Sequence, residues 1–148
     1  MERRIIRVLI IEDEKDVSLA ILRILKKMLE SLSLEGEFCR ITKYEDASLK
    51  LESEKYDLIS LDGILGNNQS TYPLVKKILD FNPEVIAFSL SSDYEQVQTA
   101  LNFGLQFGFL KDFDYDLETG DYRIITANDL QKIKEVLENK INSNNLKS

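Results

Sequence analysis

The chain of 148 residues is long enough for one domain, and its 43% hydrophobic and 30% charged residues are typical of a globular protein. Its net charge of −7, with no concentration of basic residues, argues against direct nucleic-acid binding, which depends on Lys and Arg to neutralise phosphates. The absence of histidine removes the usual zinc ligands, histidine-based acid–base catalysis and a phosphohistidine carrier role.

The location of the protein is predicted from simple features. No apolar run approaches the roughly 18 residues of a membrane span, and the first residues do not have the pattern of a secretory signal. A single cysteine excludes an internal disulfide framework. We therefore expect a cytoplasmic protein that has no membrane contact.

The first third of the chain alternates strand and helix patterns. An apolar run at 7–11 is typical of a strand buried on both faces. An apolar stripe from 17 to 32 predicts a helix, with Asp16 as its N-cap. A second strand is expected at 38–42, before a short helix around 47–51.

The middle of the chain repeats this alternation. A third strand at 57–61 ends in Asp62. The segment 63–71 is rich in Gly, Asn, Gln and Ser, which predicts a loop, and Pro73 fits the first turn of the helix that follows.

The last third adds two strands, a hairpin and a helix. Strands are expected at 85–89 and 107–110, separated by a helix that Gly104 closes. Two short alternating arms at 114–125 predict a β-hairpin inserted before the last helix, which begins near Asn128 and turns Leu130, Ile133, Leu137 and Ile141 inward.

These elements predict an α/β fold. Nearly all-apolar strands that alternate with helices imply a parallel sheet covered on both faces. Right-handed crossovers then give a doubly wound, three-layer α/β/α sandwich, with five strands in the order 2-1-3-4-5. We expect one domain over residues 1–142 and a polar, frayed tail at 143–148.

Chemically useful side chains follow the ends of four of these strands. In a parallel α/β sheet, ligands bind beyond the carboxyl ends of the strands. The residues at those ends are Glu12, Asp13, Asp62, Ser89 and Lys111. Taken singly, each also fits a loop, turn or surface role, and only their occurrence together favours a site.

This set of side chains limits the chemistry. Two like charges about 4 Å apart repel by roughly 4 kcal/mol at an effective dielectric near 20, so three carboxylates must share a proton or a cation. Oxygen ligands with open positions suit Mg²⁺, which assists phosphoryl transfer. Asp62 then fits the role of nucleophile, with Lys111 and the hydroxyl of Ser89 placed to contact phosphoryl oxygens.

With these residues in view, the chain resembles the receiver domain of bacterial two-component response regulators. The likeness covers about residues 5–113 and again the last helix. The residues that carry it are the acidic pair in Val-Leu-Ile-Ile-Glu12-Asp13, the segment Asp57-x-x-x-x-Asp62, Ser89, and Gly104 seven residues before Lys111.

The resemblance implies a function. It implies that a partner histidine kinase, or a histidine phosphotransfer protein, phosphorylates Asp62, and that Ser89 moves toward the phosphate. It also implies that Asp13, Asp62 and the backbone carbonyl of Ile64 hold Mg²⁺, with Glu12 assisting through water. The resulting expectation is a stand-alone receiver that signals by protein contact or phosphorelay, and that is an enzyme only toward its own phosphoryl group.

Several positions depart from the family pattern. Asp112 replaces a proline and is expected to pair with Lys111 and weaken its hold on phosphate. Leu90 replaces a small residue, which narrows access to Asp62. Gly108 stands where a mobile aromatic is common, so either a neighbouring Phe substitutes for it or the aromatic switch is absent. Gly66 and Ser70 replace the proline and glycine common in the loop after Asp62.

Other functions remain as alternatives. The departures favour a receiver-fold interaction module that works without phosphorylation, using the 114–125 hairpin. A Mg²⁺-dependent phosphatase needs a second aspartate two residues after the nucleophile, where this chain has Ile64. A flavodoxin needs a phosphate loop rich in Ser, Thr and Gly after the first strand, where this chain has acids.

Overall fold

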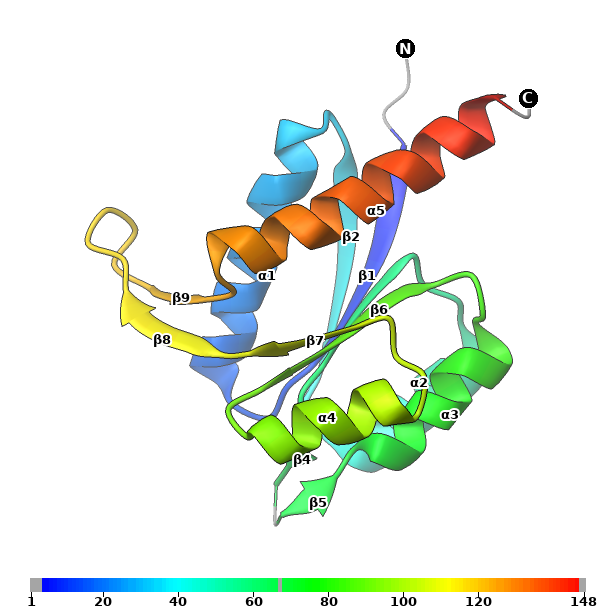
Figure 1. Ribbon diagram of the computed structural model, residues 1–148, viewed down its shortest axis with the longest axis vertical. Helices are drawn as coiled ribbons and strands as arrows, with labels where there is room; N and C mark the ends of the chain where they lie inside the picture. Colours follow the sequence, from blue (N-terminus) through cyan, green and yellow to red (C-terminus); the bar gives the residue numbers. More distant parts are fainter. Residues whose placement is uncertain (1–3, 67, 147–148) are drawn as a thin grey trace.

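A five-stranded parallel sheet forms the centre of the molecule (Figure 1). The computed structural model describes residues 4–66 and 68–146. The strand order β2-β1-β3-β6-β7 is the order predicted from the sequence. The strands are β1 (Ile5–Ile11), β2 (Glu35–Ile41), β3 (Leu58–Leu61), β6 (Ile86–Ser91) and β7 (Phe107–Leu110).

Five helices cover the two faces of the sheet, which confirms the doubly wound sandwich (Figure 1). One face is covered by α1 (Lys15–Ser31) and α5 (Ala127–Leu146). The other is covered by α2 (Tyr44–Ser53), α3 (Tyr72–Phe81) and α4 (Tyr94–Asn102). None of the helices in the described part of the chain combines the length and apolar character needed to cross a membrane.

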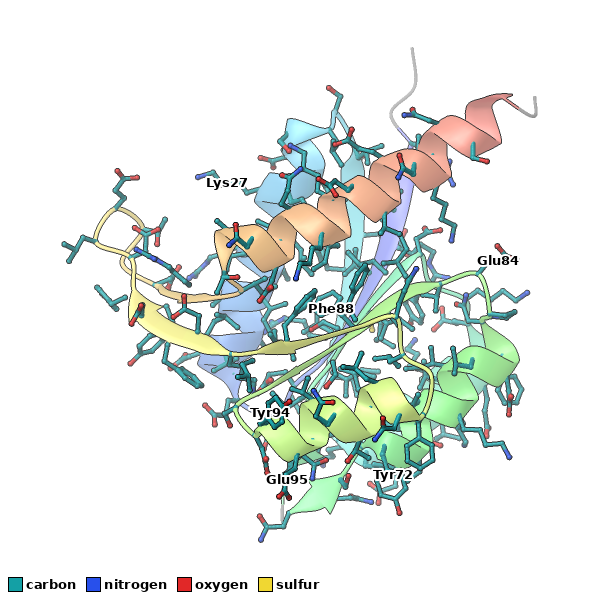
Figure 2. The ribbon with its side chains drawn as sticks, viewed as in Figure 1. Lys27, Tyr72, Glu84, Phe88, Tyr94 and Glu95 are labelled. Atoms are coloured by element: carbon teal, nitrogen blue, oxygen red, sulfur yellow. The ribbon has the colours of Figure 1, made fainter. Side chains whose placement is uncertain are left out.

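The apolar strands explain the two core layers. Successive side chains of a strand point to opposite faces, so Val8 and Ile10 pack toward α1 and α5 while Leu9 and Ile11 pack toward α2 and α3. All four are fully buried. Phe88 of β6 fills the layer beneath α5 and lies in the interior in Figure 2. A strand with polar residues on one face would contribute no apolar side chains to the core layer on that side.

Two antiparallel hairpins extend from the carboxyl edge of the sheet. The predicted insertion is confirmed as β8 (Asp112–Tyr115) and β9 (Tyr122–Ile124), which begins two residues earlier than the expected 114–125. The expected loop after β3 contains a second, very short pair, β4 (Ile64–Leu65) and β5 (Gln69–Ser70).

Several boundaries differ from expectation, among them that of β2, which begins at Glu35 rather than at 38. The predicted N-cap Asp16 is wrong, because α1 begins at Lys15 and Asp16 lies in its first turn. Strand β6 runs to Ser91, so Ser89 lies inside the strand. Helix α5 continues to Leu146 through most of the expected tail, and residues 147–148 lie outside the described residues.

Candidate functional site

The acids and the lysine at the carboxyl edge of the sheet are held by the ends of three strands. Glu12 directly follows β1, Asp62 follows β3, and Lys111 lies between β7 and β8. The hydrogen-bond ladder continues past the strand ends: the Asp62 amide donates to the Ile11 carbonyl (2.9 Å) and the Lys111 amide to the Ser91 carbonyl (2.8 Å). The backbone therefore fixes where these side chains start.

Lys111 bridges two buried carboxylates. Its Nζ lies 2.9 Å from Oε2 of Glu12 and 3.1 Å from Oδ1 of Asp62. The three side chains are only 6%, 1% and 7% exposed for Lys111, Glu12 and Asp62. Water is thus almost excluded, and each charge depends on the other two for its stabilisation.

Burial raises the pKa of both carboxyl groups. The pKa of Glu12 rises from 4.5 to about 8, because burial and the nearby Asp62 outweigh Lys111. The pKa of Asp62 rises from 3.8 to about 6, because burial and Asp13 outweigh the same lysine. Burial acts to lower the pKa of Lys111, but the two carboxylates more than offset it, so that pKa is raised. The single positive charge of Lys111 does not offset the burial of both carboxylates.

Asp13 adds a third carboxylate at the exposed side of the cluster. Oxygens of Glu12, Asp13 and Asp62 all lie within 4.8 Å of one another. Oδ2 of Asp13 accepts a hydrogen bond from the amide of Gly66 (3.0 Å), which ties the β4–β5 hairpin to the cluster. Oxygen-only donors, one of them open to solvent, fit a hard divalent cation such as Mg²⁺. Such a cation would neutralise the carboxylate charge that Lys111 does not.

The two remaining predicted site residues are placed less directly. Ile64 begins β4, two residues after Asp62, and the role of its carbonyl stays a prediction. Ser89 pairs with Leu61 in the register of β3 and β6, one residue before Asp62. Its Oγ is buried and has no hydrogen-bond partner among the described residues. An unpaired buried hydroxyl is costly in free energy, which is a feature of sites that gain a partner on binding or modification.

Packing in the core explains the presence of Leu90 and Gly108 at these positions. Leu90 is fully buried among residues that contact α1 and α5, so it serves the core. A Cβ at Gly108 would lie 2.6 Å from Cγ1 of Val97, so α4 occupies the space of any side chain there. Phe107 and Phe109 stack on each other in the opposite core layer, toward α1 and α5. The hypothesis that one of them replaces the missing aromatic is therefore wrong, since strand alternation points both rings away from α4.

The expected pairing of Asp112 with Lys111 is also wrong. Lys111 turns inward to Glu12 and Asp62. Asp112 instead uses Oδ1 to accept a hydrogen bond from the amide of Asp114 (3.0 Å) at the start of β8. A lysine with two buried carboxylates in reach gains more there than from a single partner that is already engaged with its own loop.

The contacts that join the loop after Asp62 to α4 were not predicted from the sequence. A Cβ at Gly63 would lie 2.6 Å from Cβ of Gln96 and 2.8 Å from Oγ of Ser91. Oγ of Ser70 donates to Oε1 of Gln96 (3.0 Å). The signal available in the sequence was the small size of Gly63 and Ser70, which permits close approach but does not identify the neighbour.

Comparison with known proteins agrees with this geometry at the level of the fold. No model of a protein family matches the sequence, and no curated protein matches it. A CheY-like response regulator receiver domain protein from Methanospirillum hungatei JF-1 is 19% identical over 99% of this chain and 100% of that one, with a TM-score of 0.61.

Two further solved structures agree. The receiver domain of a DNA-binding response regulator from Colwellia psychrerythraea 34H is 17% identical, covers 90% of this chain and 98% of its own, and gives a TM-score of 0.67. A response regulator from Burkholderia pseudomallei, solved with a phosphorylated aspartic acid and a calcium ion, is 20% identical over 90% of this chain and 74% of that one, with a TM-score of 0.57. The receiver resemblance inferred from the sequence is therefore confirmed for the fold: this chain has the architecture of a response-regulator receiver domain.

Proposed function

We propose that the protein is a receiver that accepts a phosphoryl group on Asp62 from a histidine kinase or histidine phosphotransfer protein. The observation that carries this proposal is the buried contact of Lys111 with Glu12 and Asp62, beside the exposed Asp13. A lysine at the edge of the sheet that reaches both acids is the arrangement that phosphoryl transfer to a carboxylate needs. The acidic charge of the chain agrees with a protein partner rather than nucleic acid.

In the proposed reaction, a carboxylate oxygen of Asp62 attacks phosphorus as the N–P bond of the donor phosphohistidine breaks. The electron pair of that bond returns to the imidazole nitrogen, which takes up a proton from solvent. Lys111 already lies 3.1 Å from Oδ1 of Asp62, where its charge would stabilise a phosphoryl oxygen. Hydrolysis reverses the modification when water attacks the same phosphorus.

The carboxylates of Glu12, Asp13 and Asp62, with the carbonyl of Ile64, would hold Mg²⁺. When bound, the cation would neutralise charge on the phosphoryl oxygens. The similar structure from Burkholderia pseudomallei was solved with a phosphorylated aspartic acid and a calcium ion, which agrees with a receiver fold that takes both a phosphoryl group and a divalent cation.

The direct test is the intact mass of the protein after incubation with Mg²⁺ and acetyl phosphate. We expect a gain of one phosphoryl group, which Asp62→Asn and a chelator each abolish. Asp57→Asn is the matched control, because Asp57 lies at the other end of the same strand and accepts a hydrogen bond from the amide of Arg7. If the unmodified protein gains no mass and does not bind beryllofluoride, Asp62 is not a phosphoacceptor.

A receiver-fold interaction module that works without phosphorylation is the second candidate. The packing of α4 onto Gly108 favours it, because position 108 carries no aromatic side chain that could move when the site changes. A partner that binds Asp62→Asn as tightly as the unmodified protein, under conditions in which the latter carries no phosphoryl group, would support the module. Binding that requires the phosphoryl group would exclude it.

A further inference from the structure

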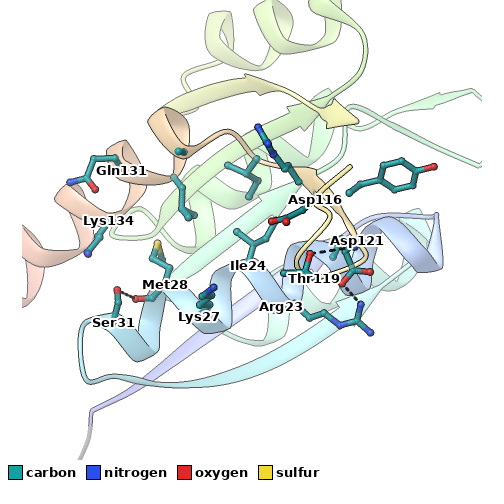
Figure 3. A pocket seen from close by; sticks show the side chains of 16 residues that line it. Arg23, Ile24, Lys27, Met28, Ser31, Asp116, Thr119, Asp121, Gln131 and Lys134 are labelled. Atoms are coloured by element: carbon teal, nitrogen blue, oxygen red, sulfur yellow. Dashed lines mark hydrogen bonds and ion pairs between the residues drawn. The ribbon is translucent and has the colours of Figure 1, made fainter. Parts of the chain in front are cut away.

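A hollow separate from the acidic cluster lies between α1, the β8–β9 hairpin and the start of α5 (Figure 3). Its volume is about 660 Å³, within the roughly 300–1,000 Å³ that is usual for small-molecule sites. None of Glu12, Asp13, Asp62, Ser89 or Lys111 lines it. Its function must therefore be inferred from its own lining.

The floor of the hollow is apolar. Ile24 and Met28 of α1 line it from one side, and Ile125 and Leu130 from the opposite side. Met28 and Ile125 are buried, while Ile24 and Leu130 are partly buried at the edge of the core. A ligand that covers this floor would remove apolar surface from water, which favours binding.

The rim of the hollow is basic in an acidic protein. Four of the 19 basic residues of the chain line it, against two of its 26 acidic residues. The basic residues are Arg23, Lys27, Arg123 and Lys134. In Figure 3, Lys27 and Lys134 lie on the two helices that flank the floor. The rim thus has a positive surplus where the molecule as a whole is negative.

The two acids at the rim are already engaged. Oδ2 of Asp121 accepts a hydrogen bond from Arg23 (2.6 Å), which fastens the hairpin to α1. Oδ1 of Asp116 accepts a hydrogen bond from the amide of Glu118 (2.9 Å) inside the hairpin loop. Lys27, Arg123 and Lys134, in contrast, make no ion pair with any residue that the structure describes.

The hairpin also limits the shape of what can bind. The Arg23–Asp121 contact brings the hairpin against α1 at one end of the hollow (Figure 3). The same ion pair also lines a smaller hollow of about 320 Å³. The two hollows share only four lining residues, Ala20, Arg23, Asp121 and Tyr122. A helix of a partner protein needs an open groove, whereas a compact ligand fits a hollow closed at one end.

We propose that this hollow binds a small amphiphilic anion, with an apolar body on the Ile24–Met28 floor and a carboxylate or phosphate head against Lys27 and Lys134. The apolar body supplies affinity through burial, and the two ammonium groups supply the charge preference. The site is independent of the phosphoacceptor role of Asp62.

Decanoate and decyl phosphate are suitable probes, titrated into the full chain by calorimetry below their micelle concentrations. We expect saturable binding of one molecule with a Kd below about 0.1 mM. Decanol, which has the same chain without the charge, and decyltrimethylammonium, which has the opposite charge, should bind at least about ten-fold more weakly. The comparison of decanoate with decyl phosphate tells which head the rim prefers.

Variants locate the binding. Lys27→Gln with Lys134→Gln should weaken decanoate binding by at least about ten-fold. Lys26→Gln with Lys132→Gln is the matched control on the same two helices, and should change it by less than about two-fold, since neither residue lines the hollow. Ala127→Trp should fill the hollow and abolish binding, because Ala127 is exposed and lines it.

The proposal is overturned if decanol binds as tightly as decanoate, or if neither anion binds. It is also overturned if Ala127→Trp, shown to be folded by circular dichroism, keeps its affinity. Binding that persists in Asp62→Asn supports the proposal, because this hollow shares no residue with the phosphoacceptor cluster.

Discussion

The two ends of β1 and β3 carry the same kind of ionic group, one cation held by two carboxylates, in opposite surroundings. At the amino end, Arg7 lies 3.0 Å from Glu54 and 3.4 Å from Glu37, with side chains 36%, 33% and 62% exposed. At the carboxyl end, Lys111 holds Glu12 and Asp62 with hardly any exposure. The amino-end group has a second cation, because Lys50 also pairs with Glu54, and it is far more exposed than the group at the carboxyl end.

Burial reverses the effect on the carboxyl groups. At the exposed end, hydrogen bonds from Lys50 and Arg7 lower the pKa of Glu54, so this acid is charged throughout the neutral range. At the buried end, the pKa values of Glu12 and Asp62 rise to about 8 and about 6. The exposed group serves the fold, whereas the buried group holds unbalanced charge that a ligand can satisfy.

The largest expected effect is that of Lys111→Ala. Removal of the lysine leaves Glu12 and Asp62 buried together, and we expect the free energy of unfolding at pH 8 to fall by roughly 3 kcal/mol. The loss should be smaller at pH 5.5, where the carboxyl groups can hold protons. Urea denaturation at both pH values measures it, with Lys132→Ala as a surface control, since Lys132 is 59% exposed. An equal loss at the two pH values would mean that the carboxylates do not depend on Lys111.

The next effect is the pH dependence of the unmodified protein without metal. Between about pH 4.5 and 8 the folded protein keeps protons on Glu12 and Asp62 that the unfolded chain has released. The free energy of unfolding should therefore rise as the pH falls from 8.5 to 5. Glu12→Gln should flatten this dependence, and Glu54→Gln should not. A protein that is most stable at pH 8.5 would contradict the raised pKa values.

Mg²⁺ should act in the opposite direction along the pH scale. A cation that binds carboxylates needs them deprotonated, so it stabilises the fold at pH 8 more than at pH 5.5. At ten times its Kd the gain is about 1.4 kcal/mol. Thermal unfolding with and without Mg²⁺ measures it, with Asp13→Asn expected to weaken the effect and Asp16→Asn, one turn away, as the control. A gain that is the same at both pH values would place the cation elsewhere.

The smallest expected effect belongs to the exposed end. Arg7→Gln removes two partly exposed ion pairs, each of which contributes about 0–1 kcal/mol, and the loss should shrink further at high salt. Phosphorylation of Asp62 should be unchanged in this variant. A loss as large as that of Lys111→Ala would show that exposure does not separate the two groups.

The fold was largely predictable, because it depends on patterns that repeat along the chain. Apolar strands such as 7–11 and 85–89 identify a doubly covered sheet wherever they occur, and the β8–β9 hairpin followed from its alternating arms. The strand ends then placed Glu12, Asp62 and Lys111 at one edge without knowledge of any contact.

The sequence could not predict which of several possible neighbours a side chain contacts. Asp112 is next to Lys111 in the sequence, but Lys111 contacts Glu12 and Asp62, which are buried at the edge of the sheet. Phe107 and Phe109 flank Gly108, but alternation turned them to the other core layer. Lys27 and Lys134 of the basic rim are far apart in the sequence, and both line the hollow only because α1 and α5 pack together.

The hydrogen bond from the amide of Gly66 to Asp13 offers a reporter inside the molecule. Gly66 has a φ of +52°, so a glycine is favoured at this turn. A cation that draws charge from the Asp13 carboxylate would weaken the hydrogen bond that this amide donates to it. The hydrogen-exchange rate of one glycine should therefore rise with Mg²⁺ concentration, and would give the occupancy of the acidic cluster with no label and no reaction.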